Sequence, residues 1–233
     1  MKRVGVTGVC LAFVMSLGGL TAVPASATAV CYEEVAKCPA ANRVPVGKKI
    51  EGHNLGNIVM TTSNGNKITC TTSEFEDEIQ VNNGGALTST TEIKALVFGG
   101  CKESVLGTTC KIKNVPEPPT WVAYIRWTKN GAVGPNGEFE PQPVEFKVEC
   151  KEAGVTCVYQ GTGAAKRLMS TVYNAGDNNK PAVSEHSEIY FNQAELVSVT
   201  GGAFCGAANA KEKGVYSITD SSVPSKDIYV SEE

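Results

Sequence analysis

The sequence predicts an all-β protein, a two-layer antiparallel β-sandwich stapled by disulfides, and leaves an Ig-like strand order and other Greek-key or meander orders equally open. Two observations predict this class. Short segments with apolar residues at every second position recur along the chain between clusters of Gly, Pro and Asn, as is typical of strands joined by turns. Cysteines lie at or near the ends of these segments, where disulfides would tie neighbouring strands together.

The N-terminal segment, residues 1–27, has the three parts of a secretory signal peptide. Basic residues at 2–3 precede an apolar run over 4–23, and a small-residue site ends at Ala27. The run is nearly long enough for a membrane anchor, but its glycines and the Ala-Ser-Ala site favour cleavage after Ala27. We therefore expect a secreted, extracellular protein that has no membrane span after cleavage, with attachment to the cell wall left open.

Composition and charge exclude one class of partner. The formal net charge of the 233 residues is only −3, and Lys and Arg are scattered among acidic residues. No basic patch for a phosphate backbone is visible, so we expect no nucleic-acid partner. Aromatic residues make up 7% of the chain, so we expect few large aromatic side chains in the core.

The cysteines are interpreted in the light of export. Cys10 is one of the nine and leaves with the signal peptide, and an even number in an oxidising compartment implies four disulfides. Connectivity stays open, although proximity favours two short links and leaves two longer ones. No Cys-x-x-Cys pair occurs and only two histidines are present, so we expect no metal site. Proximity favours Cys31 with Cys38 and Cys150 with Cys157, while Cys70 with Cys101 would close the ends of a hairpin-like unit and leave Cys110 for Cys205.

The mature chain divides into an N-terminal extension, residues 28–56, and a β-sandwich domain, residues 57–233. The extension carries its own disulfide and a helical turn over 32–37 that Pro39 stops. A hairpin around Asn64-Gly65 opens the domain. A Pro-rich stretch, 115–119, cannot supply regular ladder donors. Two polar loops follow, 130–143 with Glu138 and Glu140, and 174–181. The expected strands are 58–60, 67–70, 74–81, 92–98, 121–127, 144–150, 168–173, 187–199, 214–218 and 227–230.

An ordered set of motifs over about 67–218 carries a resemblance to a known group. The set comprises Ile-Thr-Cys70, Phe98-Gly-Gly-Cys101, a Pro and Trp segment after Cys110, Cys150 before Cys157-Val-Tyr, and a Tyr216 strand after Cys205. It resembles exported actinobacterial proteins of unknown function and is more distantly similar to bacterial activators of alkane oxidation. The resemblance implies export, a β-fold and action at or outside the cell surface, and it assigns no catalytic residue. Cys31, Cys38 and the more acidic strands depart from the pattern.

Catalytic candidates are few, and we expect no catalytic residue and no cofactor. His53 and His186 lie in polar surroundings, and no Gly-x-Ser-x-Gly elbow is present for a triad. The acidic residues Glu74, Glu76, Asp77 and Glu78 could supply a glycosidase pair or bind calcium. They lack an aromatic platform and a calcium-loop pattern, so a charged, exposed edge is the better interpretation.

The sequence thus favours a secreted, non-enzymatic binding or structural protein. Its partner would be a cell-surface component, a protein or a small apolar ligand, bound by loops or sheet faces. The alternative is a secreted acid-based hydrolase of glycosidase type. A deep cleft with two close carboxylates would favour that alternative.

Overall fold

The computed structural model describes residues 27–82, 86–115, 121–128, 135–182, 184–206 and 208–233. The expected signal peptide lies outside these residues apart from Ala27, and the Pro-rich stretch lies outside them apart from Val115. Within the described residues, regular structure is β-strand apart from three short 3₁₀ turns, η1 (Ala40–Asn42), η2 (Lys151–Ala153) and η3 (Ala203–Cys205).

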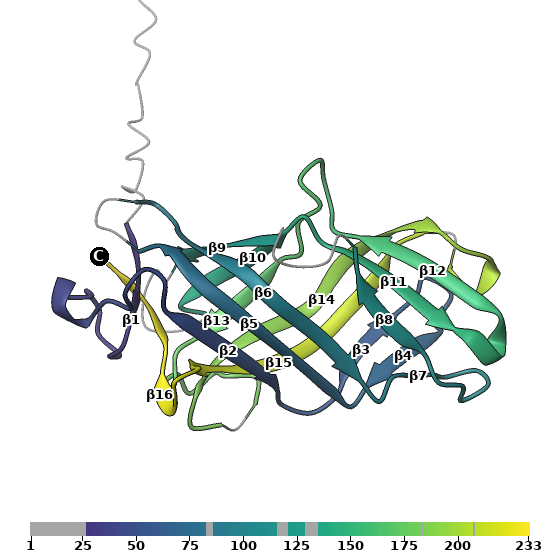
Figure 1. The fold of residues 1–233 in the computed structure, drawn as a ribbon, viewed down its shortest axis with the longest axis horizontal. Helices are drawn as coiled ribbons and strands as arrows, with labels where there is room; N and C mark the ends of the chain where they lie inside the picture. The colour runs from purple at the N-terminus through teal and green to yellow at the C-terminus, as the bar shows by residue number, and fades with distance from the viewer. Residues whose placement is uncertain (1–26, 83–85, 116–120, 129–134, 183, 207) are drawn as a thin grey trace, which may run out of the picture.

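Eight strands form a closed antiparallel barrel (Figure 1). The barrel closes because β14 and β15 pair with each other as well as with their outer neighbours. The hydrogen-bonded order is β15 (Ala210–Asp220), β2 (Lys49–Asn54), β5 (Thr72–Val81), β6 (Ser89–Gly99), β9 (Trp121–Trp127), β10 (Gly137–Gln142), β13 (Ser170–Tyr173) and β14 (Ser187–Thr200).

β14 and β15 change partners along their length. Their additional partners extend the barrel at one end, on the right in Figure 1. β15 pairs with β2 through its C-terminal half and with β3 through its N-terminal part. β14 pairs first with β13 and then with β12. The extensions are β3 (Ile58–Thr61), β4 (Lys67–Cys70) and β7 (Lys102–Glu103) on one side, and β12 (Val155–Gln160), β11 (Glu145–Cys150) and β8 (Lys111–Asn114) on the other.

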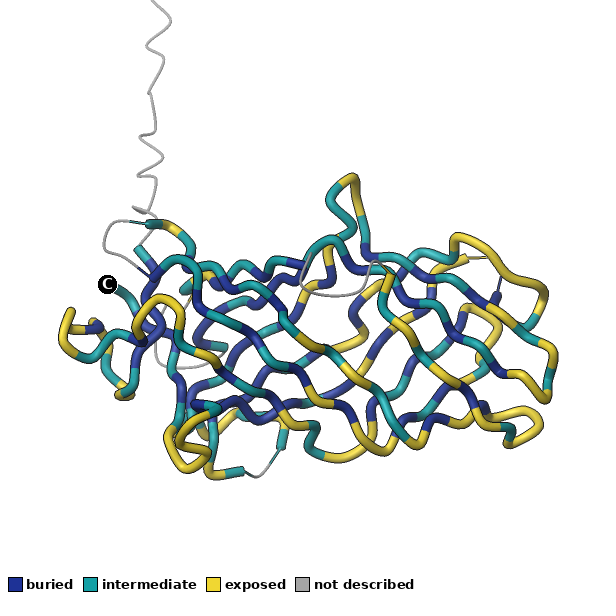
Figure 2. The backbone as a smooth tube through the Cα atoms, viewed as in Figure 1, coloured by how far each residue is buried: buried dark blue, intermediate teal, exposed yellow. Residues whose placement is uncertain are grey.

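The all-β class with disulfides is therefore confirmed, but the two-layer sandwich is wrong. Alternation along a strand predicts one inward and one outward face, and both a sandwich and a barrel satisfy it. The pairing of β14 with β15 decides between them, because it joins the two ends of one sheet. Burial alternates along the barrel strands as expected (Figure 2).

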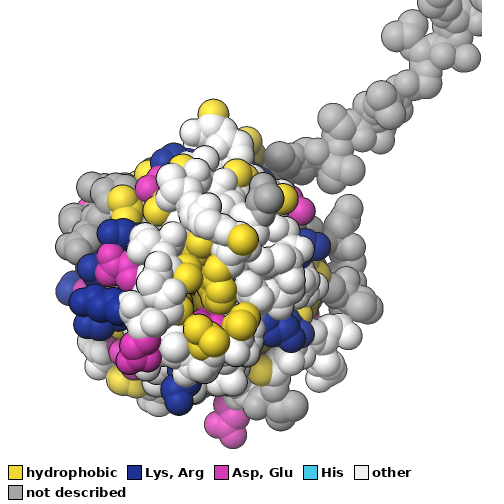
Figure 3. Space-filling view, turned by 90° about the vertical axis from the view of Figure 1, so that its right-hand side faces the viewer, with side chains coloured by type: hydrophobic (Ala, Val, Ile, Leu, Met, Phe, Trp, Pro, Cys, Tyr) yellow, Lys and Arg dark blue, Asp and Glu magenta, His cyan; other side chains and the backbone are white. Residues whose placement is uncertain are grey.

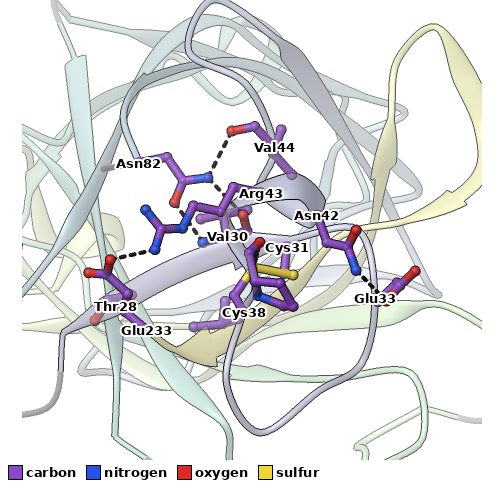
Figure 4. The surroundings of a disulfide bond; sticks show 12 residues. Thr28, Val30, Cys31, Glu33, Cys38, Asn42, Arg43, Val44, Asn82 and Glu233 are labelled. Atoms are coloured by element: carbon purple, nitrogen blue, oxygen red, sulfur yellow. Dashed lines mark hydrogen bonds and ion pairs between the residues drawn. A yellow bond between two sulfur atoms is a disulfide. The ribbon is translucent and has the colours of Figure 1, made fainter. Parts of the chain in front are cut away.

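A two-stranded ribbon closes the other end of the barrel. β1 (Thr28–Cys31) pairs with β17 (Tyr229–Glu232), and Val30 lies opposite Val230. The Asn82 side chain accepts from the Val30 N–H at 2.8 Å and donates to the Val30 and Val44 carbonyls at 2.7 and 2.8 Å (Figure 4). Asn174 holds Val230 in the same way, with bonds of 3.0 and 2.9 Å. We call residues 28–44 and 228–233 the plug.

The expected N-terminal extension is part of this plug but ends earlier than predicted. Residues 49–54 form β2, a barrel strand between β15 and β5, so the extension does not reach residue 56. The helical turn expected over 32–37 is also wrong. That stretch is held in an irregular path, because β17 pairs with β1 before it and the Cys31–Cys38 disulfide spans it (Figure 4).

One expected loop contains a strand. Residues 137–142 of the expected loop 130–143 form β10, while 129–134 lie outside the described residues. Pro141 has no backbone N–H to donate. It is tolerated in β10 because β13 pairs only with Gly137–Phe139, so position 141 lies beyond the end of that ladder. The strands β8 and β12 and the short edge strand β16 (Val223–Asp227) also lie outside the expected set.

All eight cysteines of the described residues are paired, and two pairings differ from the expected ones. Cys110 lies directly opposite Cys150 across β8 and β11, with a Cα–Cα distance of 4.1 Å, so Cys157 is left for η3. Pairing Cys150 with Cys157 and Cys110 with Cys205 is therefore wrong. The four disulfides are Cys31–Cys38, Cys70–Cys101, Cys110–Cys150 and Cys157–Cys205. Four disulfides are typical of an oxidising compartment.

Candidate functional site

The interior of the barrel contains a cavity lined almost entirely by apolar side chains. Its volume is about 30 Å³, enough for about two water molecules. Gly52 makes room for the Phe75 ring, since a Cβ at Gly52 would lie 2.0 Å from its Cε1. We call this space the central cavity, and it is lined by Phe75, Ile93, Leu96, Phe98, Trp121, Phe139, Pro141, Val144, Phe146, Leu168, Phe191, Glu212 and Tyr216.

The aromatic rings of this lining form two groups of mutually contacting rings, which together we call the aromatic wall. Phe75 lies 5.5 Å from Tyr216 and 6.0 Å from Phe139 between ring centroids. On the other side, Phe146 meets Trp121 edge-to-face at 5.7 Å. Such contacts add about 0.5–1.5 kcal/mol each to the burial of the rings, so the wall is well ordered.

Glu212 is the exception in this lining. It is only 3% exposed, and its Oε2 has no hydrogen-bond partner within the described residues. Burial raises the pKa of Glu212 from 4.5 to about 7, so the side chain is largely an uncharged carboxylic acid below neutral pH. A neutral carboxyl can both donate and accept a hydrogen bond.

A second polar atom in the same lining lacks a partner. The Trp121 indole Nε1 is buried and makes no hydrogen bond within the described residues. By contrast, the Tyr216 hydroxyl donates to Ser73 Oγ at 2.8 Å, and Ser73 donates to the Val97 carbonyl at 3.0 Å. Burial, and then the charge of Glu212, raise the pKa of Tyr216. The cavity thus holds one free donor and one free carboxyl.

Two further spaces adjoin the central cavity. A side cavity of about 10 Å³ lies among Ile58, Met60, Ile68, Cys70, Phe98, Ile112 and Glu212. An open groove of about 380 Å³ runs between β6 and β8 and is lined by residues 94–98 and 112–114. Phe98 lines all three spaces. Figure 3 looks onto the end of the molecule that carries the extension strands, on the right in Figure 1, and shows hydrophobic side chains gathered at its centre.

The acidic residues that the sequence singles out on β5 are separated by strand alternation. Glu76 and Glu78 lie on the outer surface, where Lys49 contacts Glu76 at 2.8 Å and Lys94 contacts Glu78 at 3.6 Å. Glu74 also faces outward and lies 3.6 Å from His53. These side chains face outward and are charged, as the sequence favours, but they do not lie on a sheet edge, because β5 pairs with β2 on one side and with β6 on the other.

Asp77 points into the barrel instead. Its Oδ2 accepts from the Thr91 hydroxyl at 2.8 Å, and its Oδ1 has no partner within the described residues. Burial raises the pKa of Asp77 to about 7, although the Thr91 hydrogen bond opposes the shift and the charge of Glu76 adds to it. Asp77 does not line the central cavity.

The other candidates lie apart from the cavity. His186 contacts Asp227 at 2.7 Å, and Glu138 and Glu140 pair with Arg126 and Arg167 at 3.0 and 2.9 Å. Over the part of the chain that the structure describes, no group of three or more His, Cys, Asp or Glu side chains is arranged to hold a metal ion.

Sequence reasoning missed Glu212, although a signal was present. Along residues 210–218 the inward positions are Ala210, Glu212, Gly214, Tyr216 and Ile218, so the carboxyl occupies a position where the alternation requires an apolar residue. The sequence prediction began this strand at Gly214 and therefore left Glu212 outside the pattern.

Searches against protein-family models, curated proteins and solved structures each found no match for the chain. Within the described residues, none of the helical segments is long and apolar enough to cross a membrane.

Proposed function

We propose that the protein is a secreted, non-enzymatic binding protein whose barrel interior takes a small, mainly apolar and uncharged ligand that carries one hydrogen-bonding group. Glu212 carries this proposal. A buried polar group without a partner costs about 1–3 kcal/mol, which an apolar residue at the same position would avoid. An unpartnered polar group in an otherwise apolar cavity lining is typical of a binding site.

The shape of the fold supports a ligand of modest size. An eight-stranded barrel is just wide enough for its side chains to fill it or for one small ligand. The aromatic wall offers dispersion contacts to an apolar body, while Trp121 and the neutral Glu212 offer a donor and a donor–acceptor to one polar group. An anionic ligand is disfavoured, because its charge would be buried beside a second acidic group.

The alternative, an acid-based hydrolase, receives less support. A glycosidase needs two carboxyl groups about 5–9.5 Å apart. In register, Asp77 lies opposite Ile50, and Ile50 lies opposite Asp220. Asp77 therefore lies at the level of Asp220 along the barrel. Asp220 follows Glu212 by eight positions on β15, which corresponds to roughly 27 Å along the strand, so Asp77 and Glu212 are too far apart for a glycosidase pair. Within the described residues, Glu212 is the only carboxyl group that lines the central cavity.

Secretion is supported by three observations that do not depend on the cavity. These are the leader-like residues 1–27, the four disulfides, and the resemblance to exported actinobacterial proteins. Action at the cell surface or in the medium follows from export.

Trp121 lies in the cavity wall and supplies a built-in reporter of binding. The chain has two tryptophans, so a Trp127→Phe background leaves Trp121 as the only indole. We expect hexan-1-ol to shift Trp121 fluorescence with saturation and to bind about 2–12-fold more tightly than hexane, as one net hydrogen bond predicts. In Glu212→Leu, this preference for the alcohol should disappear.

The controls come from the outer surface of the barrel and from its rim. The substitutions His53→Ala, His186→Ala, Glu76→Ala and Glu78→Ala should each change the affinity by less than about fivefold. Absence of saturable fluorescence changes with either probe would overturn the proposed function. A hundredfold loss in any of the four control variants, with the fold intact by circular dichroism, would reopen the enzymatic alternative.

A further inference from the structure

Among the described residues, an open groove in the barrel wall lies beside the central cavity, and we call it the seam. β6 pairs with β9 only through Ser89–Ile93, and beyond Ile93 its outer edge faces β8. In the described part of the chain, β8 is paired with β11 alone. Two strand edges therefore face each other across the groove of about 380 Å³ without a ladder between them.

The Asn114 side chain bridges the seam. Asn114 Nδ2 donates to the Leu96 carbonyl at 2.6 Å, and Asn114 Oδ1 is buried without a partner within the described residues. One net hydrogen bond contributes only about 0.5–1.5 kcal/mol, so breaking this bridge costs little free energy. The ladders elsewhere in the barrel wall contain several bonds per strand pair.

Phe98 forms the floor of the seam. Its ring is partly buried and meets Phe146 edge-to-face at 5.5 Å. The same ring lies between the groove and both inner spaces, together with Leu96 toward the central cavity and Ile112 toward the side cavity beside Glu212. Rotation of Phe98 would merge the three spaces into one, whose size falls in the 300–1,000 Å³ range of small-molecule sites. In the closed position, the interior has room only for water.

The opposite end of the barrel offers no comparable route. The plug covers it, and Asn82 and Asn174 each fix the plug backbone with buried hydrogen bonds. The Cys31–Cys38 disulfide also constrains the plug (Figure 4). Entry from that end would break several buried hydrogen bonds, whereas entry at the seam breaks one.

We propose that the seam between β6 and β8 is the ligand entrance, that Phe98 is its gate, and that the ligand is an elongated molecule lying from the seam to Glu212 with its uncharged polar end innermost. This inference rests on the proposed function. The three spaces share Phe98, and Glu212 lines the two inner ones, so a single slender chain can reach the carboxyl. At the mouth, Lys94 and Lys113 are paired with Glu92 and Glu149, so the entrance does not select an anion.

The test is a stopped-flow measurement of hexan-1-ol binding, followed by Trp121 fluorescence in the Trp127→Phe background. In Phe98→Ala, both the association and the dissociation rate constants should rise at least about tenfold, because the gate is removed for entry and exit alike. Asn114→Ala should raise both rates about 2–12-fold through loss of the bridging hydrogen bond. The matched control is Val199→Ala on β14, whose side chain is 47% exposed and lines none of the three spaces, and it should keep wild-type rates.

The outcomes separate the entrance from the proposed function. If the wild-type protein binds hexan-1-ol but Phe98→Ala and Asn114→Ala both keep its rates, the entrance is wrong and the binding cavity stands. If the wild-type protein does not bind, the proposed function and the entrance are both overturned. Should Phe98→Ala fail to fold, Phe98→Leu and Asn114→Ala provide the same comparison.

Discussion

Replacing Glu212 by Gln should stabilise the protein at pH 8 and leave its stability nearly unchanged at pH 4. The folded state raises the pKa of Glu212 from its ordinary 4.5 to about 7. The folded protein therefore binds this proton more tightly than the unfolded chain does. The contribution of this proton to the free energy of unfolding is therefore fully present below about pH 4.5 and is lost as the pH rises through about 7. Gln has nearly the same shape and no proton to lose, so the variant avoids this loss.

The size of the effect follows from the two pKa values. The difference between 4.5 and about 7, at about 1.4 kcal/mol per tenfold change in proton affinity, gives roughly 3 kcal/mol. For a domain of this length, that corresponds to about 6–12 °C in Tm. Tyr216 is the other ionisable side chain in the lining of the two cavities, and burial keeps it neutral over this pH range.

The assay is equilibrium unfolding in guanidinium chloride at pH 4, 6 and 8, with thermal melts in parallel. Ile218→Val is the matched control, because Ile218 faces inward on the same strand, does not titrate, and should cost about 0.5–1.5 kcal/mol at every pH. Asp77 titrates in both proteins and cancels in the comparison. An equal difference between wild type and Glu212→Gln at pH 4 and pH 8 would refute the burial of an uncharged Glu212.

Three further predictions concern the covalent structure. Non-reducing peptide mapping should recover Cys110 linked to Cys150 and Cys157 linked to Cys205, and a fragment joining Cys150 to Cys157 would contradict the fold. Replacing Cys157 and Cys205 by Ser should cost about 4 kcal/mol in the chain-entropy model, against about 2.5 for Cys31 and Cys38, because the closed loop is longer. N-terminal sequencing of the secreted protein should begin at Thr28, the first residue of β1, and an intact Met1 in the membrane fraction would count against cleavage and secretion.

Most strands and their inward faces could be predicted from the sequence. The alternation in 144–150 reports the side on which each residue is buried, and β11 occupies most of this segment. Residues 121–127 form β9 as expected, but bulky side chains on both faces suggest a strand covered on both sides, whereas only Trp121, Ala123 and Ile125 are buried. The number and location of the disulfide cysteines also follow from composition and export. These features are local, because side-chain direction in a strand depends only on the parity of the position.

The candidate site was harder to predict, because it depends on which strands meet. Asp77 and Glu76 are neighbours in one acidic run, yet one is buried in the barrel and the other pairs with Lys49 on its surface. Glu212 carries no motif, and its role arises only where β15 faces Phe98 and Ile112 across the interior.

The sequence alone determined strand content, the faces of the strands and the presence of cross-links. Tertiary structure decided between sandwich and barrel through the pairing of β14 with β15, and decided the partners of Cys150 and Cys157 through the register of β8 on β11. It also placed Phe98 both in the seam and in the two cavities that Glu212 lines. The physical reason is that strand pairing and barrel closure are long-range: backbone hydrogen bonds are the same for any pair of strands, so the choice of partner is made by how all inward side chains pack together.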